Sequence, residues 1–202
     1  MSEVPRVRTR VTPDEASAAI SRAWQERFGS PIAPDVLALL LGLWDLETAT
    51  GGSQFNFNFG NIITTTDSVP WFAMLDSGNP RKFRSFATID DGAANFVNQL
   101  TRDTRPQWRD GLLRGEPVEF VRGLKGLNGG PEYFEAPFDR YLSGYLTRWR
   151  RYRPEGFDVD GRRVSGAPEG PPEASTGAST GVTAGVVSLA TGALIWLIRR
   201  LL

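Results

Sequence analysis

Glu47 is the residue whose position in the sequence most directly suggests chemistry. It follows a strongly apolar segment, residues 34–46, and its nearby polar neighbours are Asp45 and Thr48. A carboxyl group at the C-terminal end of a buried helix meets the negative end of the helix dipole and loses water, and both effects raise its pKa. A carboxylic acid with a raised pKa can protonate a glycosidic oxygen at neutral pH. Glu47 is therefore a candidate general acid; the alternative is a solvated helix-end residue.

The segment that follows, residues 51–61, has the composition of a sugar-binding surface. It reads GGSQFNFNFGN and alternates amide and aromatic side chains around glycines. Amides hydrogen-bond hydroxyl and acetamido groups, and aromatic faces pack on sugar rings. The same alternation also fits an ordinary strand with one buried face. The sequence contains no phosphate loop, dinucleotide fingerprint or metal-binding loop.

Composition excludes much other chemistry. The 202 residues include no His and no Cys, so a Ser-His-Asp triad, a cysteine nucleophile and a zinc site of the usual kind are ruled out. We expect no cofactor and no metal. The 23 basic residues balance the 23 acidic ones, which does not favour nucleic acid as a partner. A cluster of arginines fits a solvated helix end: Arg148, Arg150, Arg151 and Arg153.

Hydrophobic periodicity predicts an α+β domain over residues 13–153, mainly helical and with a small β-hairpin lobe. Residues 1–12 have no apolar periodicity and are expected to form a flexible basic arm. Thr12, Pro13 and Glu15 form a helix-start signature. Tyr141 and Tyr145 share an apolar stripe and are expected in the core. The expected helices cover residues 13 to about 29, 34–46, 90–100, 106–113, 116–124 and 138–149, and the expected strands cover 61–66, 71–75 and 82–88.

The amino-acid composition changes twice in the C-terminal part of the chain, at residues 154 and 181. Residues 154–180 are rich in Pro, Gly and Ser and predict a flexible linker. Residues 181–198 are apolar or small, and at about 1.5 Å per residue they span roughly 27 Å, enough for a bilayer core. We therefore expect a single transmembrane helix from Gly181 to Ile198, with the lipid bilayer as a partner and residues 199–202 as a short tail.

The sequence gives weaker signals for the direction in which that helix crosses the membrane and for its self-association. Arg199 and Arg200 favour a cytoplasmic C-terminus, with the main domain on the other side of the membrane, although Arg162 and Arg163 weaken the bias. Small residues lie near one face of the helix and make helix pairing conceivable, although they also fit simple composition: Gly181, Gly185, Ser188 and Gly192.

Several motifs, in order along the chain, resemble the bacterial peptidoglycan glucosaminidases of the flagellar-muramidase and autolysin type. The resemblance covers roughly residues 14 to 150. The matching segments are Glu47-Thr-Ala-Thr-Gly-Gly-Ser53, Asn58-Phe59-Gly60-Asn61-Ile62, Ile63-Thr64-Thr65-Thr66-Asp67, Phe83-Arg84-Ser85-Phe86, Leu100-Thr101-Arg102 and Gly130-Pro131-Glu132-Tyr133. Two departures are Gly51-Gly52 in place of the family's Gly-Trp-Gly spacing, and Asp67 where the family commonly has Glu.

The resemblance implies a lysozyme-like fold and peptidoglycan glycan strands as substrate. It implies that Glu47 is the general acid and that Asp67 is the second catalytic carboxylate, with Asp76 as the fallback. Tyr133 would assist near the reacting acetamido group or water, and a mobile hairpin would bring the second carboxylate in when glycan is bound. The implied substrate-binding residues are Ser53, Asn58, Phe59 and Asn61.

The leading hypothesis is a membrane-anchored hydrolase that faces the cell wall and cuts glycan strands, as an endo-β-N-acetylglucosaminidase or a muramidase. A lytic transglycosylase of the same fold is one alternative. Others are a non-catalytic, membrane-tethered glycan-binding or assembly module, and a membrane-disrupting protein. The missing N-terminal signal peptide leaves delivery from a phage or a phage-like particle open.

Overall fold

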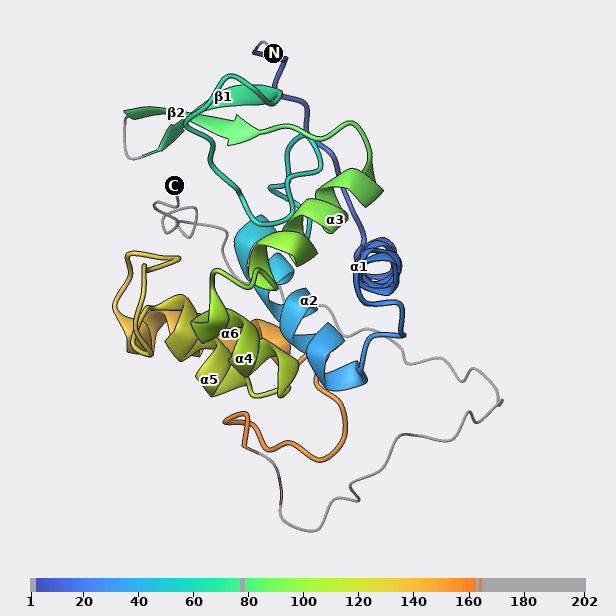
Figure 1. The fold of residues 1–202 in the computed structure, drawn as a ribbon, viewed down its shortest axis with the longest axis vertical. Helices are drawn as coiled ribbons and strands as arrows, with labels where there is room; N and C mark the ends of the chain where they lie inside the picture. The colour runs from blue at the N-terminus through green and yellow to red at the C-terminus, as the bar shows by residue number, and fades with distance from the viewer. Residues whose placement is uncertain (1–2, 77–78, 163, 165–202) are drawn as a thin grey trace.

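A computed structural model describes residues 3–76, 79–162 and 164. The described chain is mainly helical and carries a two-stranded antiparallel sheet, so the expected α+β class is confirmed (Figure 1). The helices are α1 (Pro13–Phe28), α2 (Pro34–Thr48), α3 (Ile89–Leu100), α4 (Pro106–Leu113), α5 (Pro117–Leu124) and α6 (Phe138–Trp149), and the strands are β1 (Trp71–Asp76) and β2 (Asn79–Arg84). Each predicted helix is present, with ends close to the predicted ones.

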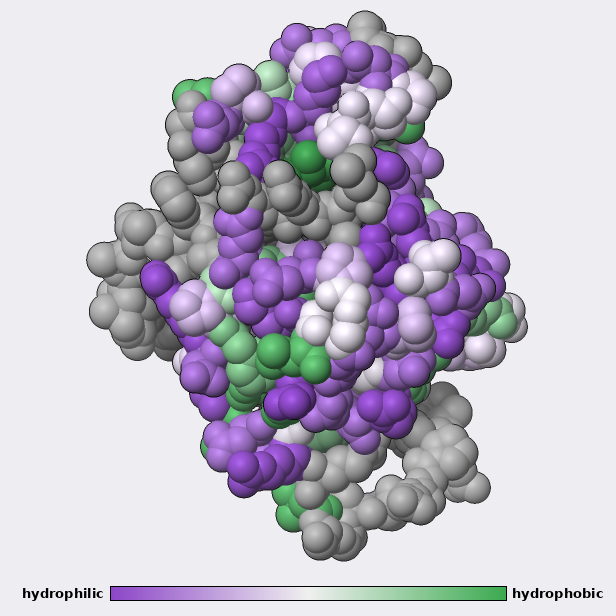
Figure 2. All heavy atoms as spheres, turned by 60° about the vertical axis from the view of Figure 1, so that its left-hand side comes forward, coloured by the Kyte–Doolittle hydropathy of each residue, from purple (hydrophilic) through white to green (hydrophobic). Residues whose placement is uncertain are grey.

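Helix α2 is the centre of the fold. Its side chains are buried nearly all round, as its apolar sequence predicts, because α1 packs on one side and α6 on another. Helix α1 starts with the predicted capping box between Thr12 and Glu15 and also packs against α3, while α4 and α5 pair with each other. The surface seen in Figure 2 is mostly hydrophilic, as expected when the large apolar side chains lie inside.

The hairpin lobe contains β1 and β2, which pair from Trp71 opposite Arg84 to Asp76 opposite Asn79. The strand expected at 61–66 is reduced to an isolated bridge between Ile63 and Phe83. Hydrogen bonds from Thr64 N to Lys82 O and from Arg84 N to Ile62 O still attach this segment to β2. The strand expected at 82–88 ends at Arg84, because Ser85 N turns to bond Pro70 O.

Residues 3–12 are packed, which corrects the expectation of a loose arm. Val4 N donates to Trp71 O, and Thr9 N donates to Gln54 O. Asn56 holds the same segment from the other side, since its Oδ1 accepts from Val7 N at 2.7 Å and its Nδ2 donates to Pro5 O at 2.9 Å. These backbone bonds do not depend on apolar side chains, so hydrophobic periodicity could not reveal them.

The folded chain also continues beyond Arg153, where the linker was expected to begin. Phe157 is buried and meets Trp149 edge-on at 5.7 Å between ring centroids. Arg150 Nε donates to Val159 O at 2.7 Å, and Val164 N donates to Gly156 O at 2.9 Å. Phe157 and these hydrogen bonds therefore extend the folded chain to Val164.

Among the described residues, no helix is long and apolar enough to cross a bilayer. The remainder of the predicted linker beyond Val164 and the predicted membrane helix at 181–198 lie outside these residues, as does the tail at 199–202. The membrane helix stays a prediction from the sequence.

Candidate active site

Glu47 lies in the last turn of α2 and is partly exposed, although its neighbours Trp44 and Thr48 are fully buried. Burial of the carboxyl group raises the pKa of Glu47 to about 8, against the opposing effects of hydrogen bonds from Tyr141 and Asn61. Removing water destabilises the ionised form more than these two donors stabilise it. Glu47 is therefore mostly protonated at pH 7, as a general acid must be.

Tyr141, from α6, contacts the Glu47 carboxyl directly. Its Oη donates to Glu47 Oε1 at 2.7 Å, and its ring stacks on Phe134 at 3.5 Å between centroids and 6° between planes. The pKa of Tyr141 is raised well above its usual value by burial and by the charge of Glu47. The phenol therefore stays neutral and acts as a hydrogen-bond donor. The apolar stripe predicts Tyr141 in the core, and it is both a core residue and part of the candidate site.

Tyr133 lies in the same group of side chains. It is buried, its Oη donates to Gly60 O at 3.2 Å, and its ring meets Trp108 edge-on. Burial and the nearby Glu47 raise its pKa well above the usual value. A Cβ at Gly60 would lie 3.0 Å from Tyr133 Oη and from the Phe96 ring, so any larger residue would push on both side chains.

The turn after α2, which begins two residues beyond Glu47, has an uncommon backbone conformation. Ala49, Thr50 and Gly51 all have positive φ, at 50°, 59° and 73°. Thr48 Oγ1 accepts from Gly51 N at 2.9 Å and donates to Trp44 O at 2.7 Å, which closes the helix end. A Cβ at Gly51 would lie 2.1 Å from Val11 O, so this turn packs tightly on the N-terminal segment.

The four predicted substrate-binding residues take different places. Asn61 Nδ2 donates to the Glu47 backbone oxygen at 2.6 Å, and Ser53 is partly exposed beside the same turn. Asn58 is fully buried and bonds the backbone of Ile62 in both directions. Phe59 is fully buried against Trp44 and Phe96. Asn58 and Phe59 therefore hold the loop in place, and neither side chain is exposed at the surface.

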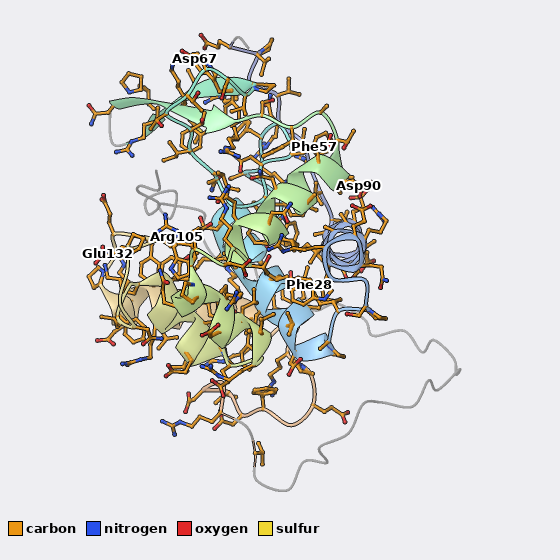
Figure 3. All side chains as sticks on the ribbon, in the orientation of Figure 1. Phe28, Phe57, Asp67, Asp90, Arg105 and Glu132 are labelled. Carbon is orange, nitrogen blue, oxygen red and sulfur yellow. The ribbon has the colours of Figure 1, made fainter. Side chains whose placement is uncertain are left out.

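Asp67 lies in the hairpin lobe, in the loop before β1 (Figure 3). It is exposed, and Lys82 Nζ lies 2.6 Å from its Oδ1. The hydrogen bond from Lys82 lowers the pKa of Asp67, so this carboxylate is ionised at neutral pH. Asp76 is the last residue of β1. The structure thus brings together Glu47, Asn61, Tyr133 and Tyr141, and it places Asp67 on the separate lobe.

The structure also contains an ion-pair network around a buried carboxylate, which was not predicted from the sequence. Asp45 is fully buried, and its carboxylate faces Arg151 at 3.0 Å and Arg148 at 3.4 Å. Tyr152 and Thr50 donate to it at 3.0 and 2.7 Å. The signal was present in the sequence, because a charged residue inside an apolar helix needs a partner and the end of α6 is rich in arginine.

No group of three or more Asp and Glu side chains that could hold a metal ion occurs within the described residues. The sequence matches no protein-family model and no curated protein. Among solved structures, the chain is similar to the glycoside hydrolase domain from Salmonella typhimurium FlgJ, with 17% identity, a TM-score of 0.48, and coverage of 70% of this chain and 88% of that one. It is also similar to a C-terminally truncated form of that domain, with 18% identity, a TM-score of 0.46, and coverage of 69% and 96%.

Proposed function

We propose that this protein is a glycoside hydrolase that cleaves the glycan strands of peptidoglycan, with Glu47 as general acid. The observation that carries the proposal is the Glu47 carboxyl, which burial keeps protonated at neutral pH in a residue that is partly exposed at a helix end. The ordered motifs from Glu47 to Tyr133 support peptidoglycan as the substrate.

In this mechanism Glu47 donates its proton to the leaving glycosidic oxygen as the bond to the anomeric carbon breaks. Tyr141 donates to Glu47 Oε1 and holds the carboxyl group in place. The hydrogen bond from Tyr141 also stabilises the carboxylate that forms once the proton has left. The neutral phenol of Tyr133 lies in the same buried group and keeps the loop at Gly60 against it.

Asp67 is the second carboxylate of the proposal. Its ionised state suits a base that activates water, a nucleophile, or a group that stabilises the oxocarbenium-like transition state. Because it lies on the hairpin lobe, the lobe would have to approach Glu47 when glycan binds. Asp76, at the end of β1, is the second candidate for this role.

The proposal includes tethering to a membrane by residues 181–198, for which the support is the length and the uncharged composition of that segment. Extraction of membranes with alkaline carbonate tests it. The full chain should stay in the membrane fraction, and deletion of residues 181–198 should release the protein.

Clearing of purified peptidoglycan by the full chain, followed by analysis of the new chain ends, tests the enzyme assignment. Wild type should clear the substrate and Glu47→Gln should not. New reducing N-acetylglucosamine ends would identify a glucosaminidase, and free muramic ends a muramidase. Anhydromuramic ends would instead show a lytic transglycosylase, and equal clearing by both proteins would remove Glu47 from the mechanism. No clearing by wild type would favour the non-catalytic binding module.

A further inference from the structure

The turn that follows Glu47 is joined to both α2 and the end of α6 through the side chain of Thr50. Thr50 N donates to the backbone oxygen of Asp45 at 3.0 Å, and Thr50 Oγ1 donates to Asp45 Oδ1 at 2.7 Å. The same hydroxyl accepts a hydrogen bond from Arg151 Nη1 at 3.3 Å. Arg151 comes two residues after the end of α6. The Thr50 hydroxyl therefore bridges the two helices that hold the candidate active site.

The backbone of Thr50 needs this support. Its φ is 59°, in the left-handed region, which is unfavourable for a residue with a branched Cβ. Such a conformation persists only where the surrounding contacts fix it. The hydroxyl bonds to Asp45 and Arg151 are the side-chain contacts that do so. Loss of the hydroxyl therefore leaves the strain of the turn without this compensation.

Asp45 is a firm anchor for the bridge. Its carboxylate is fully buried, and its Oδ2 accepts from Arg151 Nη1 and from Tyr152 Oη, both at 3.0 Å. Arg148 Nη1 lies 3.4 Å from its Oδ1. The three partners belong to α6 and to the residues directly after it. The carboxylate that holds Thr50 is thus itself held by α6.

The network is connected to both members of the Glu47–Tyr141 pair. Glu47 lies in the chain between Asp45 and Thr50, the two residues that the bridge joins. Tyr141 and Arg148 are seven residues apart on α6, about two helical turns, so they share the face that packs on α2. The contact of Arg148 with Asp45 therefore fixes the helix face that carries the Tyr141 hydroxyl.

We propose that Thr50, anchored on Asp45 and Arg151, is a positioning residue that keeps the last turn of α2 closed and thereby holds the Glu47 carboxyl in its place against α6. This inference rests on the proposed function. Thr50 acts through the backbone of the turn and takes no part in proton transfer. A helix end frays when the contacts that close it are lost. Fraying of this turn would let water reach the carboxyl group of Glu47.

The groups that face Glu47 determine the direction of the effect. Burial raises the pKa of Glu47, whereas hydrogen bonds from Tyr141 and Asn61 lower it. Tyr133 also feels the charge of Glu47, and its own raised pKa keeps its phenol neutral. Hydration of a frayed turn weakens the effect of burial, so the pKa of Glu47 should fall from about 8 toward its ordinary value of 4.5.

The test measures kcat and KM against pH on soluble peptidoglycan fragments, with full-length wild type and Thr50 variants. Thr50→Val has a similar shape but no hydroxyl, and we expect it to move the alkaline limb of the kcat profile about one pH unit lower. At pH 8 this shift lowers kcat about fivefold, while KM changes less than about twofold. Thr50→Ala, which lacks the branched Cβ as well, should shift the limb in the same direction.

Two controls accompany these variants. Thr50→Ser keeps the hydroxyl and should restore the wild-type profile. Thr147→Val removes a hydroxyl that bonds Ser143 O within α6, and it should also leave the profile unchanged. An unshifted limb in both Thr50→Val and Thr50→Ala would overturn the inference, and so would an equal shift in Thr147→Val.

A titration of the Glu47 carboxyl by ¹³C NMR separates this inference from the proposed function, because it needs no substrate. The Glu47 signal is identified by its loss in Glu47→Gln, and its pKa is compared among full-length wild type, Thr50→Val and Thr50→Ser. If wild type cleaves nothing but the pKa falls in Thr50→Val alone, the positioning role stands and the hydrolase assignment fails. If wild type cleaves peptidoglycan, Glu47→Gln does not, and the pKa is the same in all three proteins, the positioning role fails alone.

Discussion

Tyr141 Oη lies 2.7 Å from Glu47 Oε1, and this bond joins α6 to the C-terminal end of α2 across 94 residues of sequence. The bond lowers the pKa of Glu47, whereas burial raises it and prevails, so that the value is about 8. Glu47 can therefore hold a proton at neutral pH and still release it. The position of α6 against α2 thus sets the acidity of the proposed catalytic residue.

Replacement of Tyr141 by Phe should raise the pKa of Glu47 further. The phenylalanine ring keeps the stack on Phe134 but loses the donor that stabilises the carboxylate. We expect the alkaline limb of the kcat profile, which reports loss of the proton from the acid, to move to higher pH. The control is Tyr145→Phe, because Tyr145 Oη bonds Leu39 O and does not touch Glu47. A profile that coincides with wild type would exclude Tyr141 from control of the acid.

Glu47 should also make stability depend on pH, independently of any activity. Its pKa is 4.5 as the ordinary value and about 8 in the folded protein. Between these values the folded state holds a proton that the unfolded state has lost. The free energy of unfolding therefore decreases with rising pH by about 1.4 kcal/mol per unit. This contribution is complete below pH 4.5 and is gone above pH 8.

Urea unfolding at several pH values between 5 and 8 measures this effect. The unfolding free energy of wild type minus that of Glu47→Gln should fall by about 1.4 kcal/mol per pH unit over this range, because glutamine does not titrate. Glu26→Gln, at an exposed position on α1, is the control carboxyl substitution. A constant difference for Glu47→Gln would show that the folded pKa of Glu47 is ordinary.

The sequence predicts the helices well because their signals are local. Apolar spacing and the capping box at Thr12 place α1, and the continuous apolar run after Pro34 shows that α2 is central. Glu47 could also be identified from a local signal, because a carboxyl group at the end of an apolar helix is unfavourable in its charged form. The packing of residues 3–12 depends on backbone hydrogen bonds to distant loops, which leave no periodic pattern.

The rest of the site depends on contacts between residues far apart in sequence. Tyr141 lies in an apolar stripe that predicts only burial, and its hydroxyl meets Glu47 because α6 packs on α2. Conversely, the amide and aromatic residues of 51–61 suggest a sugar-binding surface, but the side chains of Asn58 and Phe59 are buried inside the domain. A polar side chain in a loop looks the same in sequence whether it contacts the backbone or a ligand.

Asp45→Asn should weaken the docking of α6 on α2. The Asp45 carboxylate is fully buried and is the shared partner of Arg148 and Arg151. Neutralising it leaves two partly exposed guanidiniums without their counter-charge, and because both can be hydrated we expect a loss of about 2 kcal/mol, the size of a hydrogen bond to a charged group. Denaturant unfolding measures the loss. Arg22→Gln, which removes an exposed pair with Asp90, should cost less than about 1 kcal/mol, and similar losses for the two variants would contradict a special role of Asp45.

Asp67→Asn and Asp76→Asn together identify the second carboxylate. If Asp67 fills that role, its replacement should lower kcat at least about 100-fold while KM changes little, because the charge acts in the transition state. Stability should be close to wild type, since Asp67 is exposed and its bond to Lys82 lies at the surface. Asp76→Asn should then keep kcat. A large loss in Asp76→Asn alone would move the role to the end of β1.

Phe157→Ala should show that the domain extends beyond Arg153. Phe157 is 7% exposed and meets the fully buried Trp149, the last residue of α6, edge-on. Truncating a buried phenylalanine removes its burial and leaves a cavity, which costs roughly 3 kcal/mol. Val159, two residues further, is 55% exposed, and Val159→Ala keeps the backbone oxygen that Arg150 bonds. If the segment is part of the fold, urea unfolding should separate the two variants clearly. If both behave as wild type, the folded domain ends near Arg153, where the composition of the sequence changes.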